Sequence, residues 1–384
     1  MTKKLYDLDS HMFAFDAVVL SCAPYRERYA VTLDQTAFFP EGGGQYADTG
    51  TLGNAAVLDV QEESGDIIHY TDKPLSVGET VRGELDGVKR FRRMQNHSGE
   101  HIVSGIVHRL FGYDNVGFHL SDDDMTVDYN GTLTREDLDR VETLANEAVA
   151  QNLTVLAEYP APDVLAALRY RSKLDLTENV RIVTIGDVDC CACCAPHVSR
   201  TGEIGVIKIL DFERYKGGVR CHILCGFPAL EDYRTKYLNI QSISLALCVP
   251  QHETAQGVQR LIEDCKQKEY SIVGLRRKLA ELALENAAKS DHCLCFFADA
   301  ACDTDSLRHA VNLGMQQKEV CAGFLPAESG WRYCIGSAVV DLRAKAKEIN
   351  AALQGRGGGQ IGMIQGTANA SQNDIRAYFE YFTV

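Results

Sequence analysis

The sequence predicts an α+β protein of several domains, and three observations support this fold class. At 384 residues the chain is longer than one compact core usually accommodates. Its first ninety or so residues are β-rich, and helical spacing of apolar residues begins soon after them. We expect an N-terminal small β-barrel, an α/β domain, a long helical segment and a C-terminal α/β domain, covering 1–90, 91–235, 236–290 and 291–384.

The N-terminal part is predicted from five short stretches rich in β-branched and aromatic residues. Gly, Pro, Ser and Asp separate them, which is typical of strands joined by turns. The pattern indicates a small β-barrel or sandwich. The stretches are 16–22, 29–35, 55–61, 66–72 and 80–86.

Helical spacing runs from about residue 95 to 111, and Gly112 is a natural stop. At roughly 100° per residue, His97 and His101 fall opposite the apolar stripe of this helix. We therefore expect them to face away from the helix's own core contact, where a pair at i and i+4 can converge on one ion. The stripe consists of Ile102, Val103, Ile106, Val107 and Leu110.

A second pair of metal-type ligands, Cys193 and His197, also has i, i+4 spacing. Pro196 makes a regular helix through this pair unfavourable. Together with His97 and His101, the pair makes a set of soft and borderline donors that suits zinc better than other common ions. The sequence therefore predicts a zinc site.

Three further elements follow from local signals. Thr134 and Asp137 resemble a capping box at the start of a helix over about 134–151. After the second ligand pair, two β-rich stretches joined by a Lys-Gly-Gly turn indicate a hairpin, which would present basic side chains beside the metal. Residues 251–290 are typical of a long charged helix with heptad-like spacing, serving either as an intramolecular spacer or as a dimer-forming hairpin.

Two glycine-rich runs, 40–45 and 355–366, have two interpretations. Glycines let backbone N–H groups approach an anion closely and form a nest. A glycine-rich turn is more often only a tight or mobile loop. Composition alone does not decide between them.

The composition favours a globular cytoplasmic protein. Hydrophobic residues make up 45% and charged residues 24% of the chain. No apolar run is long enough to span a bilayer, and the N-terminal segment lacks the features of a secretory signal. We expect the fourteen cysteines to be reduced thiols that are buried or metal-bound.

The net charge of −14 restricts any nucleic-acid contact to local basic patches. Two clusters beside the ligand pairs are candidates, with ordinary solvated faces as the alternative. They are Lys89, Arg90, Arg92 and Arg93, and Lys208, Arg214, Lys216 and Arg220.

In order and spacing, the motifs resemble the freestanding alanyl-tRNA editing proteins of the AlaX family. They are TAFFPEGGGQYADTG, then HSGEH, then CCAPHVSRTGEIG with the basic hairpin, and finally GRGGGQIGMIQG. The last motif makes the chain similar to the long form, whose C-terminal domain also ends alanyl-tRNA synthetases. The threonyl-tRNA synthetase editing domain shares the ligand pairs, but the GGGQ barrel and the C-terminal domain point to the alanyl branch.

The resemblance implies site residues. His97, His101, Cys193 and His197 would be the zinc ligands of the editing domain. Thr36 and Gln45 lie in the stretch that borders the amino-acid pocket, and we expect Gln45 to help hold the ester. The family's common C-G-G-T-H loop is here C-C-A-P-H, so the pocket contact of that loop's threonine has no counterpart.

The resemblance also implies a function, a zinc-dependent hydrolase that deacylates mischarged tRNA(Ala). No aminoacylation domain is recognised, so we expect editing in trans. Serine is the favoured mischarged amino acid and glycine a lesser one, since a site that binds the serine hydroxyl penalises its absence by about 10⁴-fold. Zinc would act as a Lewis acid, although four protein ligands close a tetrahedral site that catalytic zinc usually leaves open. The C-terminal region would form a homodimer or grip the tRNA elbow.

Two other classes of protein are consistent with parts of the sequence. HSGEH fits the H-x-x-E-H metallopeptidase pattern with Glu100 as general base, but this leaves the second ligand pair and both glycine runs unexplained. A zinc-stabilised RNA-binding module without catalysis is the other alternative. Release of serine from charged tRNA(Ala) distinguishes editing from both.

Overall fold

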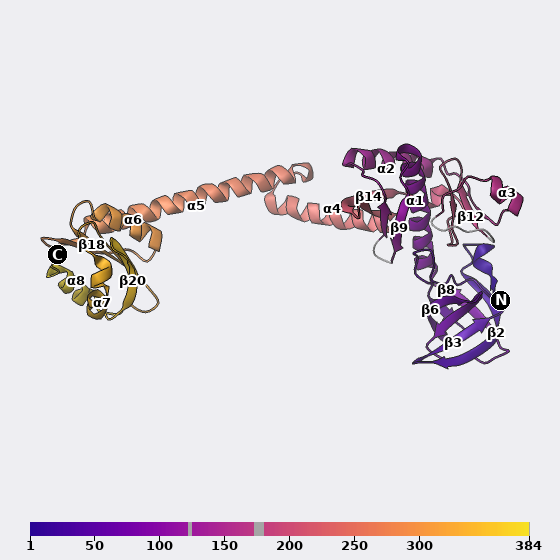
Figure 1. Cartoon of the computed structure of the whole chain (residues 1–384), viewed down its shortest axis with the longest axis horizontal. Coiled ribbons are helices and arrows are strands. Elements are labelled where there is room, and N and C mark those ends of the chain that lie inside the picture. The colour runs from indigo at the N-terminus through magenta and orange to yellow at the C-terminus, as the bar shows by residue number, and fades with distance from the viewer. Residues whose placement is uncertain (122–124, 173–179, 384) are drawn as a thin grey trace. The chain divides into compact units, whose positions relative to one another are not determined.

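The computed structural model describes residues 1–121, 125–172 and 180–383. The chain divides into two compact units, Met1–Asn239 and Ile240–Val384. Both contain helices and sheets (Figure 1), which confirms the predicted mixed α/β, multidomain architecture. Within the described ranges, no helix combines the length and the apolar character needed to cross a membrane.

Six N-terminal strands form a closed barrel in the order β2-β3-β7-β6-β5-β8. Alternate side chains fill its interior, as the pleat of a strand requires. At Gly50, a Cβ atom would lie 2.1 Å from the carbonyl oxygen of Glu84, so only glycine permits this approach. The strands are β2 (Ala14–Tyr25), β3 (Arg28–Leu33), β5 (Gly50–Leu52), β6 (Ala55–Glu63), β7 (Asp66–Thr71) and β8 (Thr80–Leu85), and all five predicted stretches lie within or overlap them. Beside the barrel, β1 (Lys3–Lys4) pairs with β4 (Gln35–Thr36), and η1 (Leu5–Asp7) follows β1.

Helix α1 (Gly87–Phe111) is the central element of the first unit. Asp86 caps its first turn through the N–H of Lys89, and Gly112 ends it with a φ of 70°. Every residue from Met94 to Val107 is buried. The helix is therefore covered on both sides: its apolar stripe packs into the core, and other chain segments fold over the side that carries the histidines.

Two sheets, helix α2 (Arg135–Ala150) and the short helix η2 (Thr201–Ile204) pack against α1. Helix α2 starts with the predicted capping box between Thr134 and Asp137. The predicted hairpin is also present, as β14 and β15. The first sheet has the order β14-β15-β10-β9 and the second β11-β12-β13. Their strands are β9 (Asn115–Leu120), β10 (Met125–Tyr129), β14 (Ile207–Tyr215), β15 (Gly218–Cys225), β11 (Val155–Glu158), β12 (Ile182–Ile185) and β13 (Asp189–Ala192), with helices α3 (Pro162–Ala167) and η2 between them.

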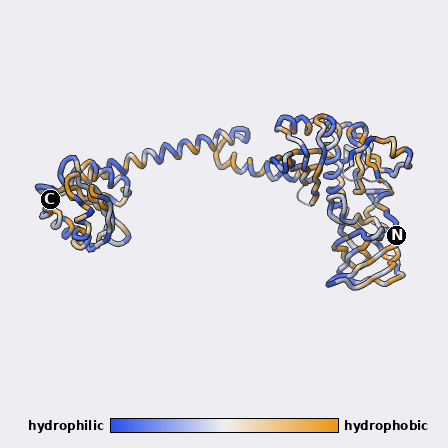
Figure 2. Tube along the Cα trace, in the orientation of Figure 1, coloured by the Kyte–Doolittle hydropathy of each residue, from blue (hydrophilic) through white to orange (hydrophobic). Residues whose placement is uncertain are grey.

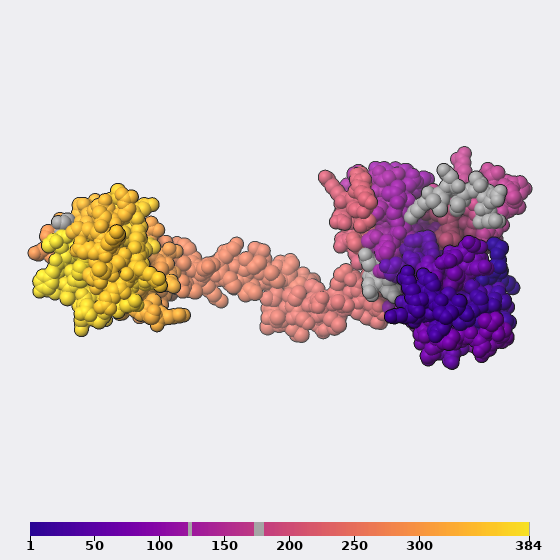
Figure 3. Space-filling model, turned by 60° about the horizontal axis from the view of Figure 1, so that its bottom comes forward, coloured from indigo at the N-terminus to yellow at the C-terminus, as the bar shows by residue number. Residues whose placement is uncertain are grey.

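A buried arginine joins the barrel to α1. Arg90 is 0% exposed and donates to the Asp48 carboxylate and to the backbone oxygens of Ser10 and Ala37. In the space-filling view the barrel lies directly against the rest of this unit (Figure 3). Arg93 is also buried and donates to the Ala47 oxygen at 2.6 Å. Two of the four residues of the predicted basic cluster at 89–93 are therefore buried in structural contacts and are not available to a nucleic acid.

Helix α4 (Phe227–Leu247) crosses the boundary between the units and begins nine residues before the expected helical segment, at 227 instead of 236. In the second unit, α5 (Thr254–Glu285) follows η3 (Gln251–Glu253) and leads into a sheet of order β16-β17-β18-β19-β21-β20. The glycine run forms most of hairpin β20–β21. The remaining elements are β16 (Ala288–Lys289), β17 (Cys293–Phe297), α6 (Thr304–Gly314), β18 (Val320–Pro326), β19 (Trp331–Ser337), α7 (Leu342–Ala352), β20 (Arg356–Gln360), β21 (Met363–Ala368) and α8 (Gln372–Glu380).

Candidate metal centre and adjoining cavity

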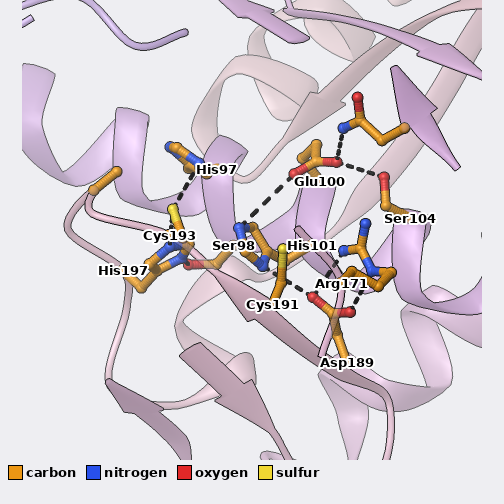
Figure 4. A network of polar contacts seen from close by, with 12 residues as sticks. His97, Ser98, Glu100, His101, Ser104, Arg171, Asp189, Cys191, Cys193 and His197 are labelled. Atoms are coloured by element: carbon orange, nitrogen blue, oxygen red, sulfur yellow. Dashed lines mark hydrogen bonds and ion pairs between the residues drawn. The ribbon is translucent and has the colours of Figure 1, made fainter. Parts of the chain in front are cut away.

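The four predicted ligands come together in the first unit. One potential donor atom from each lies within 4.8 Å of the others. Helix α1 carries His97 and His101, while Cys193 and His197 lie on the segment after β13 (Figure 4). That segment is not helical, as Pro196 predicts.

Distances within this group fit one tetrahedral metal ion. Sγ of Cys193 lies 3.5 Å from Nε2 of His97 and 3.4 Å from Nε2 of His197. Typical zinc–sulfur and zinc–nitrogen bonds at a tetrahedral angle place two such donors about 3.5 Å apart. The four residues can therefore hold a metal ion without rearrangement of these three atoms.

Each of the three histidines is held through its other ring nitrogen. Nδ1–H of His97 donates to Oε1 of Gln45 at 2.9 Å, and Nδ1–H of His101 donates to Oδ2 of Asp189 at 2.9 Å. Nδ1 of His197 lies 3.0 Å from the Ser98 hydroxyl. These contacts leave all three Nε2 atoms for the centre, which is the arrangement of metal-ligating histidines.

The electrostatics favour a thiolate at Cys193 and a neutral imidazole at His197. Burial alone would raise the pKa of the Cys193 thiol, but His97 and His197 hold it well below its ordinary value. Burial lowers the pKa of His197 to about 3, against an opposing contribution from Cys193. Burial also opposes charge on His101, but the hydrogen bond to Asp189 and the nearby Cys193 raise its pKa. Thiolate and neutral imidazole are the forms that bind metals.

The segment that carries the second ligand pair is fixed by Arg181. Its guanidinium donates to the backbone oxygens of Cys193 and Ala195 at 3.1 and 2.8 Å. Its own backbone oxygen accepts from the N–H of Cys193 at 3.0 Å. The side chain is 5% exposed and lies 3.3 Å from the Asp7 carboxylate. This network orders a segment that has no regular secondary structure.

The first glycine run is a tight turn that delivers Gln45 to the centre. Gly42 and Gln45 exchange backbone hydrogen bonds of 3.1 and 3.0 Å. Gly44 has a φ of 84°, and a Cβ atom there would lie 2.6 Å from the oxygen of Phe118. The turn therefore needs glycine to pack against β9, and Gln45 behind it is fully buried.

Thr36, the other residue expected near the amino-acid pocket, is bonded inside the barrel. Its hydroxyl lies 2.8 Å from Nε2 of His69 and accepts from the N–H of Phe38 at 3.1 Å. His69 is a buried histidine that spacing did not single out.

A cavity of about 1170 Å³ opens beside the centre and is lined by His97, His101 and Cys193. Its described lining does not include Thr36 or Gln45, although it includes Gly43 and Gly44 of the same turn. Basic side chains form part of its wall, and none of the four from the β14–β15 hairpin is among them. The hairpin's basic residues are therefore not beside the candidate metal centre, contrary to expectation. The basic residues that line it are Lys4, Arg109, Arg169, Arg171 and Arg181.

Sequence reasoning missed four polar residues that support the centre. Asp189 lies four positions before Cys193, and Ser98 follows His97 directly. A search for hydrogen-bonding partners next to the ligands would have suggested both. Arg171 and Arg181 carry no local signal, because they act through contacts with the folded segment around β13.

Comparisons with known proteins agree with the motifs. Residues 180–220 match the family model of the threonyl and alanyl tRNA synthetase second additional domain, and residues 12–89 match that of class II (A) tRNA synthetases. The alanine–tRNA ligase of Natronomonas pharaonis is 37% identical over 298 residues, which cover 73% of this chain and 32% of the ligase. The chain spans about a third of the length of the ligases it matches.

Two editing proteins match over nearly their whole length. The alanyl-tRNA editing protein Aarsd1 of Danio rerio is 28% identical over 94% of this chain and 93% of its own. The alanyl-tRNA editing protein AlaX-L of Pyrococcus horikoshii is 28% identical over 98% and 96%. With the converging ligands and the barrel that carries Gln45, these matches show that the chain belongs to the AlaX family of alanyl-tRNA editing proteins, in its long form.

Proposed function

We propose that this protein is a zinc-dependent deacylase that acts in trans on mischarged tRNA(Ala), with the seryl ester as main substrate and the glycyl ester as a second. The observation that carries the proposal is the convergence of His97, His101, Cys193 and His197 beside a large cavity that the first three of them line. The matches to proteins named alanyl-tRNA editing proteins support it.

Zinc fits the donor set better than other common ions, since one thiolate and three imidazoles are soft and borderline ligands. Sγ of Cys193 and the three Nε2 atoms would hold the ion. When bound, zinc supplies Lewis acidity for polarising an ester carbonyl or a water molecule. Four protein donors complete a tetrahedral set, which favours an organising role for the ion.

Gln45 has a donor available for the ester. Its Oε1 atom is committed to His97, whereas its Nε2 atom is buried and makes no hydrogen bond among the described residues. A buried amide donor without a partner costs free energy, so a substrate oxygen at this atom would be favourable, although it would have to pass Gly43 and Gly44, which line the cavity in place of Gln45. Thr36 would have to leave His69 to contact a substrate, and the proposal therefore gives Gln45 the larger role.

The cavity suits an aminoacylated RNA end in size and charge. Its volume of about 1170 Å³ exceeds that of most small-molecule sites. Arg109 and Arg169 line it, are exposed, and have no ion-pair partner in the described part of the chain. Such cations can contact phosphates on the RNA backbone.

Deacylation of tRNA(Ala) charged with serine, glycine or alanine tests the proposal. We expect release of serine and glycine and sparing of alanine, and loss of activity in His101→Ala. Equal rates on all three esters would contradict editing. Unchanged activity in His101→Ala would contradict the metal centre, and tight tRNA binding without turnover would favour an RNA-binding module.

A further inference from the structure

The hydrogen bond from His101 to Asp189 differs from those of the other two histidines. Gln45 and Ser98 are neutral partners, whereas Asp189 places a carboxylate on Nδ1–H of His101 at 2.9 Å. The side chains of His101 and Asp189 are 3% and 2% exposed. The contact is therefore a charge-assisted hydrogen bond away from water, which is stronger than its neutral counterparts.

Asp189 is itself held at both carboxylate oxygens by Arg171. Nε of Arg171 donates to Oδ1 at 2.7 Å and Nη2 donates to Oδ2 at 2.9 Å. The two parallel hydrogen bonds fix the plane of the carboxylate as well as its position. The backbone of Arg171 is tied to the strand, since its N–H donates to Cys190 at 2.8 Å and its oxygen accepts from Ala192 at 2.9 Å.

Gly105 allows the carboxylate to reach the metal-binding helix. A Cβ atom at this position would lie 2.4 Å from the oxygen of Val188 and 2.8 Å from Cβ of Asp189. Any other residue would push β13 away from α1. The close approach one helical turn after His101 sets the distance between the ring and the carboxylate.

The same geometry argues against a second cation beside Asp189. His101, Asp189 and Cys191 could together offer three donor atoms within 4.8 Å of one another. Both oxygens of Asp189 already accept from Arg171, and one also accepts from His101. An added cation would have to displace the guanidinium, so Asp189 serves the histidine.

We propose that Asp189 is a positioning residue, held by Arg171, that keeps His101 as the Nδ1–H tautomer with Nε2 directed at the metal centre. Without the carboxylate the ring is free to rotate or to place its proton on Nε2, which removes a ligand. Outer partners of this kind contribute about 10- to 100-fold to metal affinity. The inference rests on the metal centre of the proposed function but does not depend on which ester is hydrolysed.

The test compares Asp189→Asn with Asp187→Asn in the full chain. Asp187 is an exposed carboxylate that lines the same cavity, so it controls for lost negative charge. Zinc affinity is measured by competition with a chelator, and the tautomer of His101 by ¹⁵N NMR of the zinc-loaded protein, in which one ring nitrogen binds the ion and the other carries the proton. We expect Asp189→Asn to bind zinc about 10- to 100-fold more weakly and to lose the uniform Nδ1–H state, with Asp187→Asn like the wild type.

Asp189→Asn leaves Arg171, whose side chain is 15% exposed, without its carboxylate, which can impair folding. The double variant Asp189→Asn with Arg171→Met removes both charges and should show the same loss of zinc affinity in a folded protein. If either variant folds and keeps the wild-type zinc affinity and the wild-type His101 tautomer, the inference is wrong. That outcome would not contradict the proposed deacylation. If the variants bind zinc more weakly but the wild-type protein releases no serine, the inference stands and the proposed function is wrong.

Discussion

Oε1 of Gln45 accepts a hydrogen bond of 2.9 Å from Nδ1–H of His97. This single contact couples the glycine turn beside the barrel to the metal-binding helix, two elements that lie 52 residues apart in the sequence. The turn therefore acts on the centre through a ligand's second nitrogen, and Gly44 lets it pack closely against Phe118.

Replacing Gln45 should weaken metal binding before it affects folding. Gln45→Ala leaves Nδ1–H of His97 buried without its acceptor, and we expect zinc affinity to fall about 10-fold or more. Chelator competition measures the loss. Gln61→Ala is the control, since the Gln61 amide bonds to Glu41 and Asp59 on the barrel. Equal affinities of the two variants would show that the contact does not support the centre.

Two arginines of the predicted basic cluster, Arg90 and Arg92, should differ greatly in their effect on stability. Arg90→Met removes the arginine that pairs with the buried carboxylate of Asp48, so we expect the free energy of unfolding to fall by about 3–5 kcal/mol. Arg92 pairs with Glu231 at the surface, and Arg92→Ala should cost less than about 1 kcal/mol. Chemical denaturation measures both. Similar losses would contradict the structural role of Arg90.

His69 should make the barrel sensitive to acid. Burial lowers its pKa from 6.5 to about 4, so between these pH values the unfolded chain binds a proton that the folded chain does not. Stability from this residue is therefore present above pH 6.5 and is lost as the pH falls towards 4. Relative to His69→Gln, the wild type should lose about 2 kcal/mol between pH 7 and 5. If urea titrations give the same difference in unfolding free energy between the wild type and His69→Gln at pH 7 and at pH 5, this account is wrong.

Local features of the sequence predicted much of the fold and the ligands. Alternating apolar residues mark β2, β3, β6, β7 and β8, and the capping box at Thr134 marks the start of α2. The spacing of the ligand pairs identified all four residues of the centre. These signals lie within a few residues of one another, where periodicity and capping chemistry are readable.

Contacts between distant segments could not be predicted in this way. Arg90 appeared to be a surface cation because its partner Asp48 lies 42 residues away in another element. Arg171 and Asp189 are 18 residues apart and meet only when the segment after α3 lies against β13. Composition cannot distinguish a solvated charge from a buried ion pair, since the distinction is made by tertiary packing.

The arginines at the cavity should carry part of the electrostatic attraction to tRNA. Replacing Arg109 and Arg169 by alanine is expected to weaken tRNA binding and to lower the slope of log K against log salt by about one unit for each lost phosphate contact. Filter binding at several salt concentrations measures the slope. Arg234→Ala, on the exposed part of α4, is the matched control. A larger effect from Arg214→Ala and Lys216→Ala would place the RNA on the hairpin instead.

The exposed apolar side chains of helix α5 favour a dimer-forming role over that of an intramolecular spacer. Apolar positions recur along it, seen as orange segments between blue ones (Figure 2), and several large apolar side chains are exposed. Leu261 and Leu275 are 51% and 61% exposed, and burying the exposed part of each against a second copy would contribute roughly 1–2 kcal/mol. We therefore expect a homodimer whose mass, measured by light scattering, falls to that of a monomer in Leu261→Glu with Leu275→Glu. Glu263→Gln with Glu269→Gln, on the same helix, controls for altered charge. If the wild-type protein stays monomeric at high protein concentration, α5 is a spacer whose apolar residues are exposed to solvent.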